Sequence, residues 1–247
     1  MRSVYGVEEL SMSGFSAAFG RIFRDNGLED FLECSEKFEF LYGKLIEANS
    51  RVNITAITDR DEVIVKHFAD CVLVAEYIPQ NADVVDIGCG GGFPTLPLAI
   101  VRPDIKIFAV DSVAKKLVFV DGVSRDLGLS VTVAAARAEE LGHDEELREK
   151  FDVCVSRAVA RLDGLSELCL PLVKVGGAFV AMKGSDGLAE LREAENAVRI
   201  LGGTPSASDN FRLSDGSERY IFRIEKTSVT PEKYPRKYNK IKKEPLK

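Results

Sequence analysis

The chain has 247 residues, which fits one large α/β domain or a domain with a sizeable extension. Hydrophobic residues make up 45% and charged residues 29%, which is ordinary for a soluble globular protein and excludes wholesale disorder and a small disulfide scaffold. No apolar stretch approaches the roughly 18 residues that span a bilayer, the N-terminal sequence shows no export signal, and the five cysteines form no CxxC pair. With only two histidines, no zinc-ligand spacing exists. We therefore expect a reduced, cytoplasmic protein with no bound metal and no membrane segment.

The net charge of −6 conceals an asymmetry between the body of the chain and its tail. Eight lysines and arginines stand against two glutamates in 226–247, so this tail carries +6 and residues 1–225 carry −12. A basic tail on an acidic body favours attraction to a polyanion, although many basic tails only keep a protein soluble.

Residues 1–79 are predicted to form a helical extension packed on the core. Apolar residues recur at three- and four-residue steps through 31–46, which is typical of an amphipathic helix. Thr58, followed by Asp61 and Glu62, predicts the start of the next helix, which Pro79 ends. The polar segment between these helices, 49–55, is expected to be irregular.

After Pro79, short β-branched runs alternate with longer helical stretches. The predicted strands are 82–87, 105–111, 131–136, 151–156 and 178–183, the helices between and after them are 93–102, 112–128, 162–173 and 186–201, and a hairpin of 209–213 with 219–225 closes the chain. Repeated β-α units predict an α/β fold with a doubly wound, mostly parallel sheet and an antiparallel C-terminal hairpin. We expect a catalytic or binding domain over 80–226 and a basic tail over 227–247.

The most informative motif is a glycine-rich loop at the end of the first predicted strand. Asp86, Gly88, Gly90 and Gly92 form the pattern D-x-G-x-G-x-G, and Phe93 follows directly. Glycines at such a strand-to-helix turn let the backbone approach a nucleotide closely. The spacing differs from the dinucleotide pattern G-x-G-x-x-G and from a phosphate-binding P-loop, and resembles motif I of S-adenosylmethionine (SAM)-dependent methyltransferases. A glycine-rich turn without a ligand remains the alternative.

Two carboxylates follow the next predicted strands. Asp111 ends the second strand, where a carboxylate can accept hydrogen bonds from both ribose hydroxyls, or can simply cap the following helix. Ala138 and Glu139 follow the third strand, where methyltransferases hold the adenine, although Glu139 also suits the first turn of a helix.

Beyond motif I, the sequence resembles the bacterial 16S ribosomal RNA guanine-N7 methyltransferases, also called glucose-inhibited division protein B. The matching segments, in chain order, are NITAI (53–57), HFADC (67–71), DIGCGGGFPTLPLAI (86–100), VDS (110–112), RAEEL (137–141), SRAVARL (156–162), LCLPLVK (168–174), AMKG (181–184) and KYPRK (233–237). The chain departs from the pattern at Gly91, often alanine, at Cys71, commonly serine, and after KYPRK, where the family usually has glycine.

This resemblance implies a Rossmann-like methyltransferase that uses SAM to methylate a guanine at conventional position 527 of 16S ribosomal RNA. It implies that 16S ribosomal RNA, or the small ribosomal subunit, is the partner, and we expect a monomer. Carried over residue by residue, SAM contacts fall on Gly88, Phe93, Asp111, Ser112, Val113, Ala138, Glu139 and Arg157, and the motif adds Asp86, Gly90 and Gly92.

Basic and polar residues near the strand ends and in the tail are candidates for binding RNA. They are Asn53, His67, Arg161, Lys183, Lys233, Arg236 and Lys237. Arg157 and Arg161 flank the exit of the fourth strand, where an arginine can stack on a base or bind phosphate. The structural alternatives are an ion pair for Arg157, a surface position for Arg161 and Lys183, and a core position for His67.

The expected chemistry requires no general base, so we assign no catalytic residue. Guanine N7 carries an exposed lone pair and can attack a sulfonium methyl as it stands, provided that the reacting atoms are in line. The sequence contains no D/N-P-P-Y motif, typical of amine methyltransferases, and no Pro-Cys nucleophile. Three alternatives stay open: a methyltransferase for another RNA or a small molecule, a non-catalytic RNA-binding module, and an NAD(P)-dependent dehydrogenase.

Overall fold

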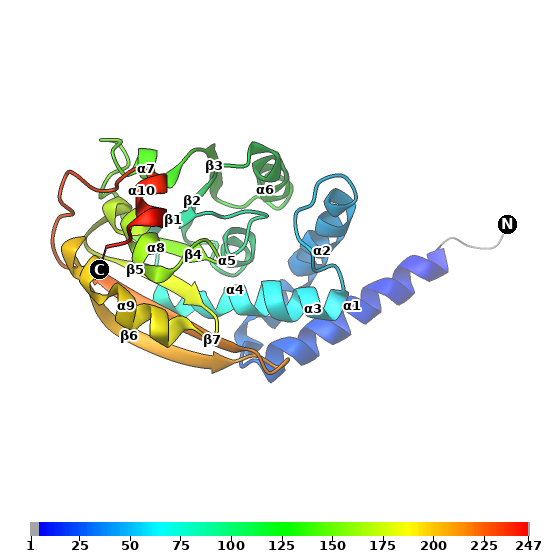
Figure 1. Cartoon of the computed structure of the whole chain (residues 1–247). Coiled ribbons are helices and arrows are strands. Elements are labelled where there is room, and N and C mark those ends of the chain that lie inside the picture. The colour runs from blue at the N-terminus through cyan, green and yellow to red at the C-terminus, as the bar shows by residue number, and fades with distance from the viewer. Residues whose placement is uncertain (1–4, 247) are drawn as a thin grey trace.

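A seven-stranded mixed sheet forms the centre of the molecule in the computed structural model, which describes residues 5–246 and the side chains of 14–246 (Figure 1). The strands are β1 (Asp83–Ile87), β2 (Lys106–Asp111), β3 (Val131–Ala135), β4 (Phe151–Arg157), β5 (Val173–Lys183), β6 (Gly203–Arg212) and β7 (Glu218–Lys226), in the order β3-β2-β1-β4-β5-β7-β6. The first five are parallel, and β7 runs antiparallel to both β5 and β6. The predicted doubly wound sheet with an antiparallel hairpin is confirmed.

Helices cover both faces because successive strand residues point to opposite sides of the sheet. In β1, for example, Val84 packs into one apolar core and Val85 into the other. The first core is covered by the N-terminal helices with α5 (Thr95–Val101) and α6 (Ala114–Asp126). The second is covered by α8 (Leu162–Cys169), the short turn η4 (Leu170–Leu172) and α9 (Gly187–Ile200), with the short helix α7 (Ala138–Leu141) beside them.

The N-terminal segment is helical and shares one apolar core with the sheet. Its elements are α1 (Tyr5–Asp25), η1 (Glu29–Cys34), α2 (Ser35–Asn49) and a continuous helical stretch of α3 (Arg60–Val63), η2 (Ile64–Ala69), α4 (Asp70–Val72) and η3 (Leu73–Tyr77). The fully buried rings of Phe19, Phe38 and Phe68 join α1, α2 and η2. Figure 1 shows α3 and α4 running alongside α1 toward the sheet.

The start predicted for the second helix was one residue early. Asp59, rather than Thr58, is the N-cap: its Oδ1 accepts a hydrogen bond from the Glu62 backbone N–H at 3.0 Å. A carboxylate also complements the positive end of the helix dipole, which favours Asp over Thr at this position.

The C-terminal segment returns to the domain after β7. It ends in a helix that sequence analysis did not predict, α10 (Tyr238–Lys243), which packs on α8 through buried Ile241. In Figure 1 this helix, in red, lies close to α7 and α8. The predicted extension 1–79 and tail 227–247 each include residues outside the described range, 1–4 and 247 respectively. Within 5–246, no helix is both long and apolar enough to cross a bilayer.

Candidate functional site

A cavity of about 440 Å³ opens at the carboxyl ends of β1, β2 and β4. This is the edge of a parallel α/β sheet at which ligands generally bind. Eight of the predicted cofactor residues line it: Gly88, Gly90, Phe93, Asp111, Ser112, Ala138, Glu139 and Arg157. Residues from four separate predicted segments thus meet in one place, which the sequence order alone did not show.

The glycine loop between β1 and α5 forms the floor of this cavity. Gly88 has φ +75°, and a Cβ built there would lie 2.3 Å from a Val159 methyl, so both the conformation and the space require glycine. Gly90 has φ +53°, but a Cβ there meets nothing closer than the Gly88 carbonyl at 4.0 Å. The Gly90 position therefore faces open space at the cavity, where a ligand can approach bare backbone.

Asp111 holds the glycine loop against the end of β2. Its Oδ2 accepts a hydrogen bond from the Gly90 N–H at 2.8 Å, and its Oδ1 accepts one from the Val113 N–H at 2.8 Å. Each carboxylate oxygen can accept a second hydrogen bond, so the side chain can serve both the loop and a ligand. The side chain of Val113, also predicted to contact SAM, is exposed and is not among the residues that line the cavity.

Asp86 supports the loop from below and does not line the cavity. It is fully buried, and its Oδ2 accepts hydrogen bonds from the hydroxyl and backbone N–H of Thr95, at 2.5 and 3.2 Å. Burial raises the pKa of Asp86 to about 7, and the Thr95 donors oppose that shift. Its Oδ1 has no hydrogen-bond partner in the described part of the chain. Gly92 also lies outside the lining: it packs on Leu96 of α5, where a Cβ would lie 2.7 Å from a Leu96 methyl.

His67 and Phe93 join the N-terminal segment to the cavity. Their rings stack with centroids 4.6 Å apart, and the Arg157 guanidinium lies 5.6 Å from the Phe93 ring centroid. Arg157 Nη2 lies 3.3 Å from His67 Nδ1, and His67 Nε2 lies 2.8 Å from the Thr55 hydroxyl. Because a guanidinium can only donate, Nδ1 is the acceptor and Nε2 carries the proton.

The electrostatic surroundings keep His67 uncharged. Burial, followed by the positive charge of Arg157, lowers the pKa of His67 to about 4. His67 therefore lines the cavity as a neutral ring with both nitrogens in hydrogen bonds, close to the satisfied core position that was its structural alternative.

A second cavity of about 560 Å³ adjoins the first, and both are lined by 157–159. Asp70 lies buried at its edge, where its two carboxylate oxygens accept hydrogen bonds from Arg157 and Arg219 at 3.0 Å each. Lys183, also lining this cavity, forms an ion pair with Glu190 at 2.8 Å. The neighbouring Arg161 is exposed and forms an ion pair with Glu193 at 2.5 Å.

The other residues predicted to bind RNA lie apart from these cavities. Asn53 is exposed on the irregular segment that follows α2, next to Ile54 and Thr55 of the first cavity. Lys233 and Lys237 are exposed on the C-terminal segment. Arg236, in contrast, is held by the buried carboxylate of Glu167, so its guanidinium is committed within the protein.

Comparison with known proteins decides the family. The family model described as rRNA small subunit methyltransferase G matches residues 34–217. The chain belongs to this family. Ribosomal RNA small subunit methyltransferase G of Oceanobacillus iheyensis is 44% identical over 92% of this chain and 98% of that protein, and that of Halalkalibacterium halodurans is 45% identical over 85% and 90%. The protein is therefore a SAM-dependent methyltransferase, which sets aside the dehydrogenase and the non-catalytic binding module.

Solved structures of other methyltransferases share the fold. A SAM-dependent O-methyltransferase from Thermotoga maritima superimposes with a TM-score of 0.51 at 15% identity, covering 77% of this chain and 73% of that one. TrmN from Thermus thermophilus gives 0.50 at 20% identity, covering 75% and 52%. The Rossmann-like methyltransferase fold predicted from the family resemblance is confirmed.

The cavity suits the methyl donor of a methyltransferase of this family. Its volume lies in the range of about 300–1,000 Å³ that small-ligand sites occupy. The bare backbone at Gly90 can admit the ligand closely, the Asp111 carboxylate can accept ribose hydroxyls, and the apolar Val110 and Leu168 can flank a purine.

Sequence reasoning missed several residues of the cavity of this methyltransferase. Ile54 and Thr55 line it, and they lie in the NITAI segment of the family resemblance, which could have pointed to them. Arg137 lies one position from the predicted Ala138, and Lys116 lies three positions from the predicted Val113. No sequence motif pointed to Tyr238 of α10, because it lies in the C-terminal segment, which was predicted to bind RNA.

Proposed function

We propose that this protein transfers the methyl group of SAM to N7 of a guanine in 16S ribosomal RNA, at conventional position 527. SAM would lie in the 440 Å³ cavity, on the glycine loop, with its ribose at Asp111. The membership of the chain in the rRNA small subunit methyltransferase G family supports an rRNA substrate.

The junction of the two cavities is the observation that carries this proposal. The segment 157–159, at the carboxyl end of β4, lines both. Ala158 there has φ +57°, a conformation that costs a residue with a side chain roughly 1–2 kcal/mol and that is concentrated at functional sites. Because 157–159 line both cavities, a guanine in the second cavity would present its edge to a ligand in the first.

The acid–base groups at this junction suit a nucleophile that needs no deprotonation. His67 has a pKa lowered to about 4 by burial and by Arg157, and Arg157 occupies its acceptor nitrogen. Both oxygens of Asp70 accept from arginines. These groups bind and neutralise one another, so none of them removes a proton from the substrate. This fits methylation at N7 and disfavours an exocyclic amine.

When bound, SAM supplies an electrophilic sulfonium methyl. The residues of the chain would orient the reactants: Phe93 and His67 wall one side, and Arg157, fixed by Asp70, keeps a positive charge at the junction. Positioning reactants in line at contact distance is the main source of acceleration available here.

Methylation mapping of small-subunit RNA from strains with and without the gene tests the proposal. The expected result is loss of one 7-methylguanine, at position 527, in the deletion strain, restored by the wild-type chain and not by a Gly90→Val variant. Loss of a mark on another atom or in another RNA would overturn the assignment of the substrate while leaving the family intact.

A further inference from the structure

The C-terminal segment reaches the cofactor cavity. Tyr238, the first residue of α10, lines the cavity together with Ala138, Glu139 and Leu168. Its side chain is partly buried, whereas its neighbours Lys237 and Asn239 are exposed. An aromatic ring from the last part of the chain thus stands at the end of the cavity where β3 and α7 meet.

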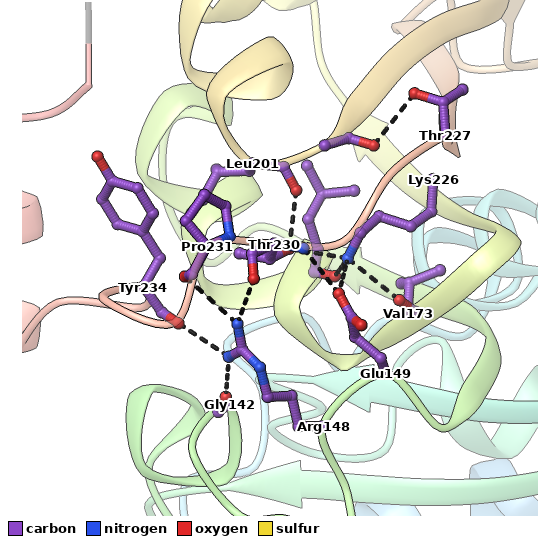
Figure 2. A network of polar contacts seen from close by, with 12 residues as sticks. Gly142, Arg148, Glu149, Val173, Leu201, Lys226, Thr227, Thr230, Pro231 and Tyr234 are labelled. Carbon is purple, nitrogen blue, oxygen red and sulfur yellow. Dashed lines mark hydrogen bonds and ion pairs between the residues drawn. The ribbon is translucent and has the colours of Figure 1, made fainter.

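Buried polar contacts hold this segment in place from its beginning. The side chain of Lys226, at the end of β7, has no exposed surface. Its Nζ donates to Glu149 Oε1 at 2.9 Å, to the Leu170 carbonyl at 2.7 Å and to the Thr230 hydroxyl at 2.8 Å, as Figure 2 shows in part. A buried charge with three such partners fixes the backbone that follows it, because any displacement would leave the charge unpaired.

Arg148 fastens the middle of the segment. Its guanidinium donates to the carbonyls of Thr230 at 2.7 Å and Tyr234 at 2.8 Å, and to the Gly142 carbonyl beside α7 (Figure 2). One planar donor group therefore ties the C-terminal segment to the loop that follows α7, a helix whose first residues line the cofactor cavity.

A buried ion pair lies two residues before Tyr238. Glu167 of α8 is fully buried, and its carboxylate accepts from Arg236 Nε at 2.8 Å, from Nη2 at 2.6 Å and from the Arg236 backbone N–H at 2.8 Å. Leu168, the next residue of α8, lines the cavity. The ion pair therefore sets the distance between the start of α10 and the cavity wall.

We propose that Tyr238 is a cofactor-binding residue whose ring packs against the adenine end of SAM. This rests on the cofactor site proposed above. The C-terminal segment is therefore a wall of the cofactor site, and its sequence is a determinant of SAM affinity.

Calorimetric titration of RNA-free protein with SAM tests this role. Because base-on-aromatic stacking is strong, Tyr238→Ala should raise the Kd for SAM about tenfold. Tyr238→Phe, which keeps the ring, should stay within about twofold. Lys242→Ala is the matched control, an exposed change on the same helix that should leave the Kd unchanged. The melting temperature of each variant is measured without SAM.

A second measurement covers the case in which Tyr238→Ala does not fold. The chain has no tryptophan, so Tyr238→Trp places a single tryptophan at the cavity, and Val229→Trp places one on the same segment at a 66% exposed position. SAM should change the emission of the first variant and not of the second.

The outcomes separate the two proposals. If the wild type binds SAM while folded Tyr238→Ala binds equally well, or Tyr238→Trp stays silent at saturation, the role of Tyr238 is overturned and the cofactor site stands. If Gly90→Val binds SAM as tightly as the wild type does, the cofactor site proposed here falls, and the assignment of Tyr238 falls with it.

Discussion

The imidazole of His67 stacks on the ring of Phe93, with centroids 4.6 Å apart and planes inclined by 18°. This contact joins the helical N-terminal segment to the residue that directly follows the glycine loop. The N-terminal segment is therefore part of the wall of the cavity proposed for SAM, to which it also contributes Ile54 and Thr55. A change in that segment can alter cofactor binding without touching the sheet.

Replacing Gly90 with valine should abolish SAM binding while the protein stays folded. The added side chain would project into the open space that the ligand needs, and its φ of +53° costs about 1–2 kcal/mol in a residue with a Cβ. Calorimetry measures binding, and a melting curve measures the strain.

The matched control is Gly27→Val, between α1 and η1. Gly27 has φ +69° with nothing within 4 Å of a built Cβ, so it should lose similar stability and keep its SAM affinity. Equal SAM binding by wild type and folded Gly90→Val would remove the cofactor from the glycine loop.

Changing Asp111 to alanine should weaken SAM binding by about 1–3 kcal/mol, through loss of charge-assisted ribose contacts. Its carboxylate also accepts from the Gly90 and Val113 N–H groups, so part of the loss comes from the loop. An analogue lacking the ribose 2′-hydroxyl separates the two parts. The wild type should bind this analogue more weakly than SAM, and Asp111→Ala should bind the two equally. An equal loss of affinity in both proteins would show that Asp111 only supports the loop.

The first five strands could be located from the sequence because each contains a short apolar run. Strand β5, however, begins at Val173 rather than at 178, and the polar, mostly exposed β6 begins at Gly203 rather than at 209. The glycine loop could be predicted because its D-x-G-x-G-x-G pattern lies at the end of a predicted strand. The partner of a buried charge could not be predicted: Arg236 and Glu167 are 69 residues apart, and nothing local marks either as buried. A basic residue in a polar tail therefore suggests solvent or RNA, and only the folded chain shows that Arg236 closes an ion pair.

Contacts with other parts of the chain also explain why the positions of Asp86 and Tyr238 could not be predicted. Asp86 belongs to the methyltransferase motif, but the motif does not say whether the carboxylate points to the ligand or under the loop; the hydroxyl of Thr95, nine residues later, turns it inward. Tyr238 reaches the cavity only because buried contacts on Lys226, Arg148 and Arg236 fold the tail back. Such contacts follow from three-dimensional packing, which periodicity does not encode.

Two buried groups should give stability opposite dependences on pH. His67 has its pKa lowered from 6.5 to about 4, so the unfolded state binds more protons and this group lowers stability as pH falls from about 6.5 to 4. Asp86 has its pKa raised from 3.8 to about 7, so the folded state binds more protons and this group lowers stability as pH rises from about 4 to 7.

Single variants should reveal the two opposed contributions. Relative to the wild type, Asp86→Asn should become more stable as pH rises through about 4 to 7, and His67→Gln should become less stable over about 4 to 6.5, each by a few kcal/mol. Urea unfolding at half-unit pH intervals measures this. Differences of the same sign for both variants would contradict the assigned protonation states.

The rate of methyl transfer should be nearly constant between about pH 6 and 9. N7 of guanine needs no deprotonation, and the neutral His67 does not titrate in this range. Single-turnover rates at saturating SAM and RNA give the profile. Asp86→Asn is the control, because it removes the buried carboxyl that titrates near pH 7 under the loop. A tenfold rise in rate per pH unit would instead indicate an amine or carbon acceptor that must lose a proton.

The basic side chains of the C-terminal segment should fall into two groups, one that stabilises the fold and one that binds RNA. Arg236→Ala leaves Glu167 buried without its partner and should destabilise the protein by about 3–5 kcal/mol, with weaker SAM binding because Tyr238 follows two residues later. Arg236 was predicted to bind RNA, and its guanidinium is held by Glu167 in the structure. Arg161→Ala is the control: its ion pair with Glu193 is exposed and should contribute less than about 1 kcal/mol.

The exposed Lys233 and Lys237 should act on RNA instead. Each phosphate that a lysine neutralises releases a counterion, so removing both side chains should reduce the slope of log affinity against log salt by about 1–2. The double variant Lys233→Ala/Lys237→Ala should melt as the wild type does, and its apparent KM for RNA should rise. Filter binding across a salt series, with melting curves on the same samples, decides the point. An unaltered salt slope together with a lowered melting temperature would show that these lysines, like Arg236, stabilise the fold and that RNA is held elsewhere.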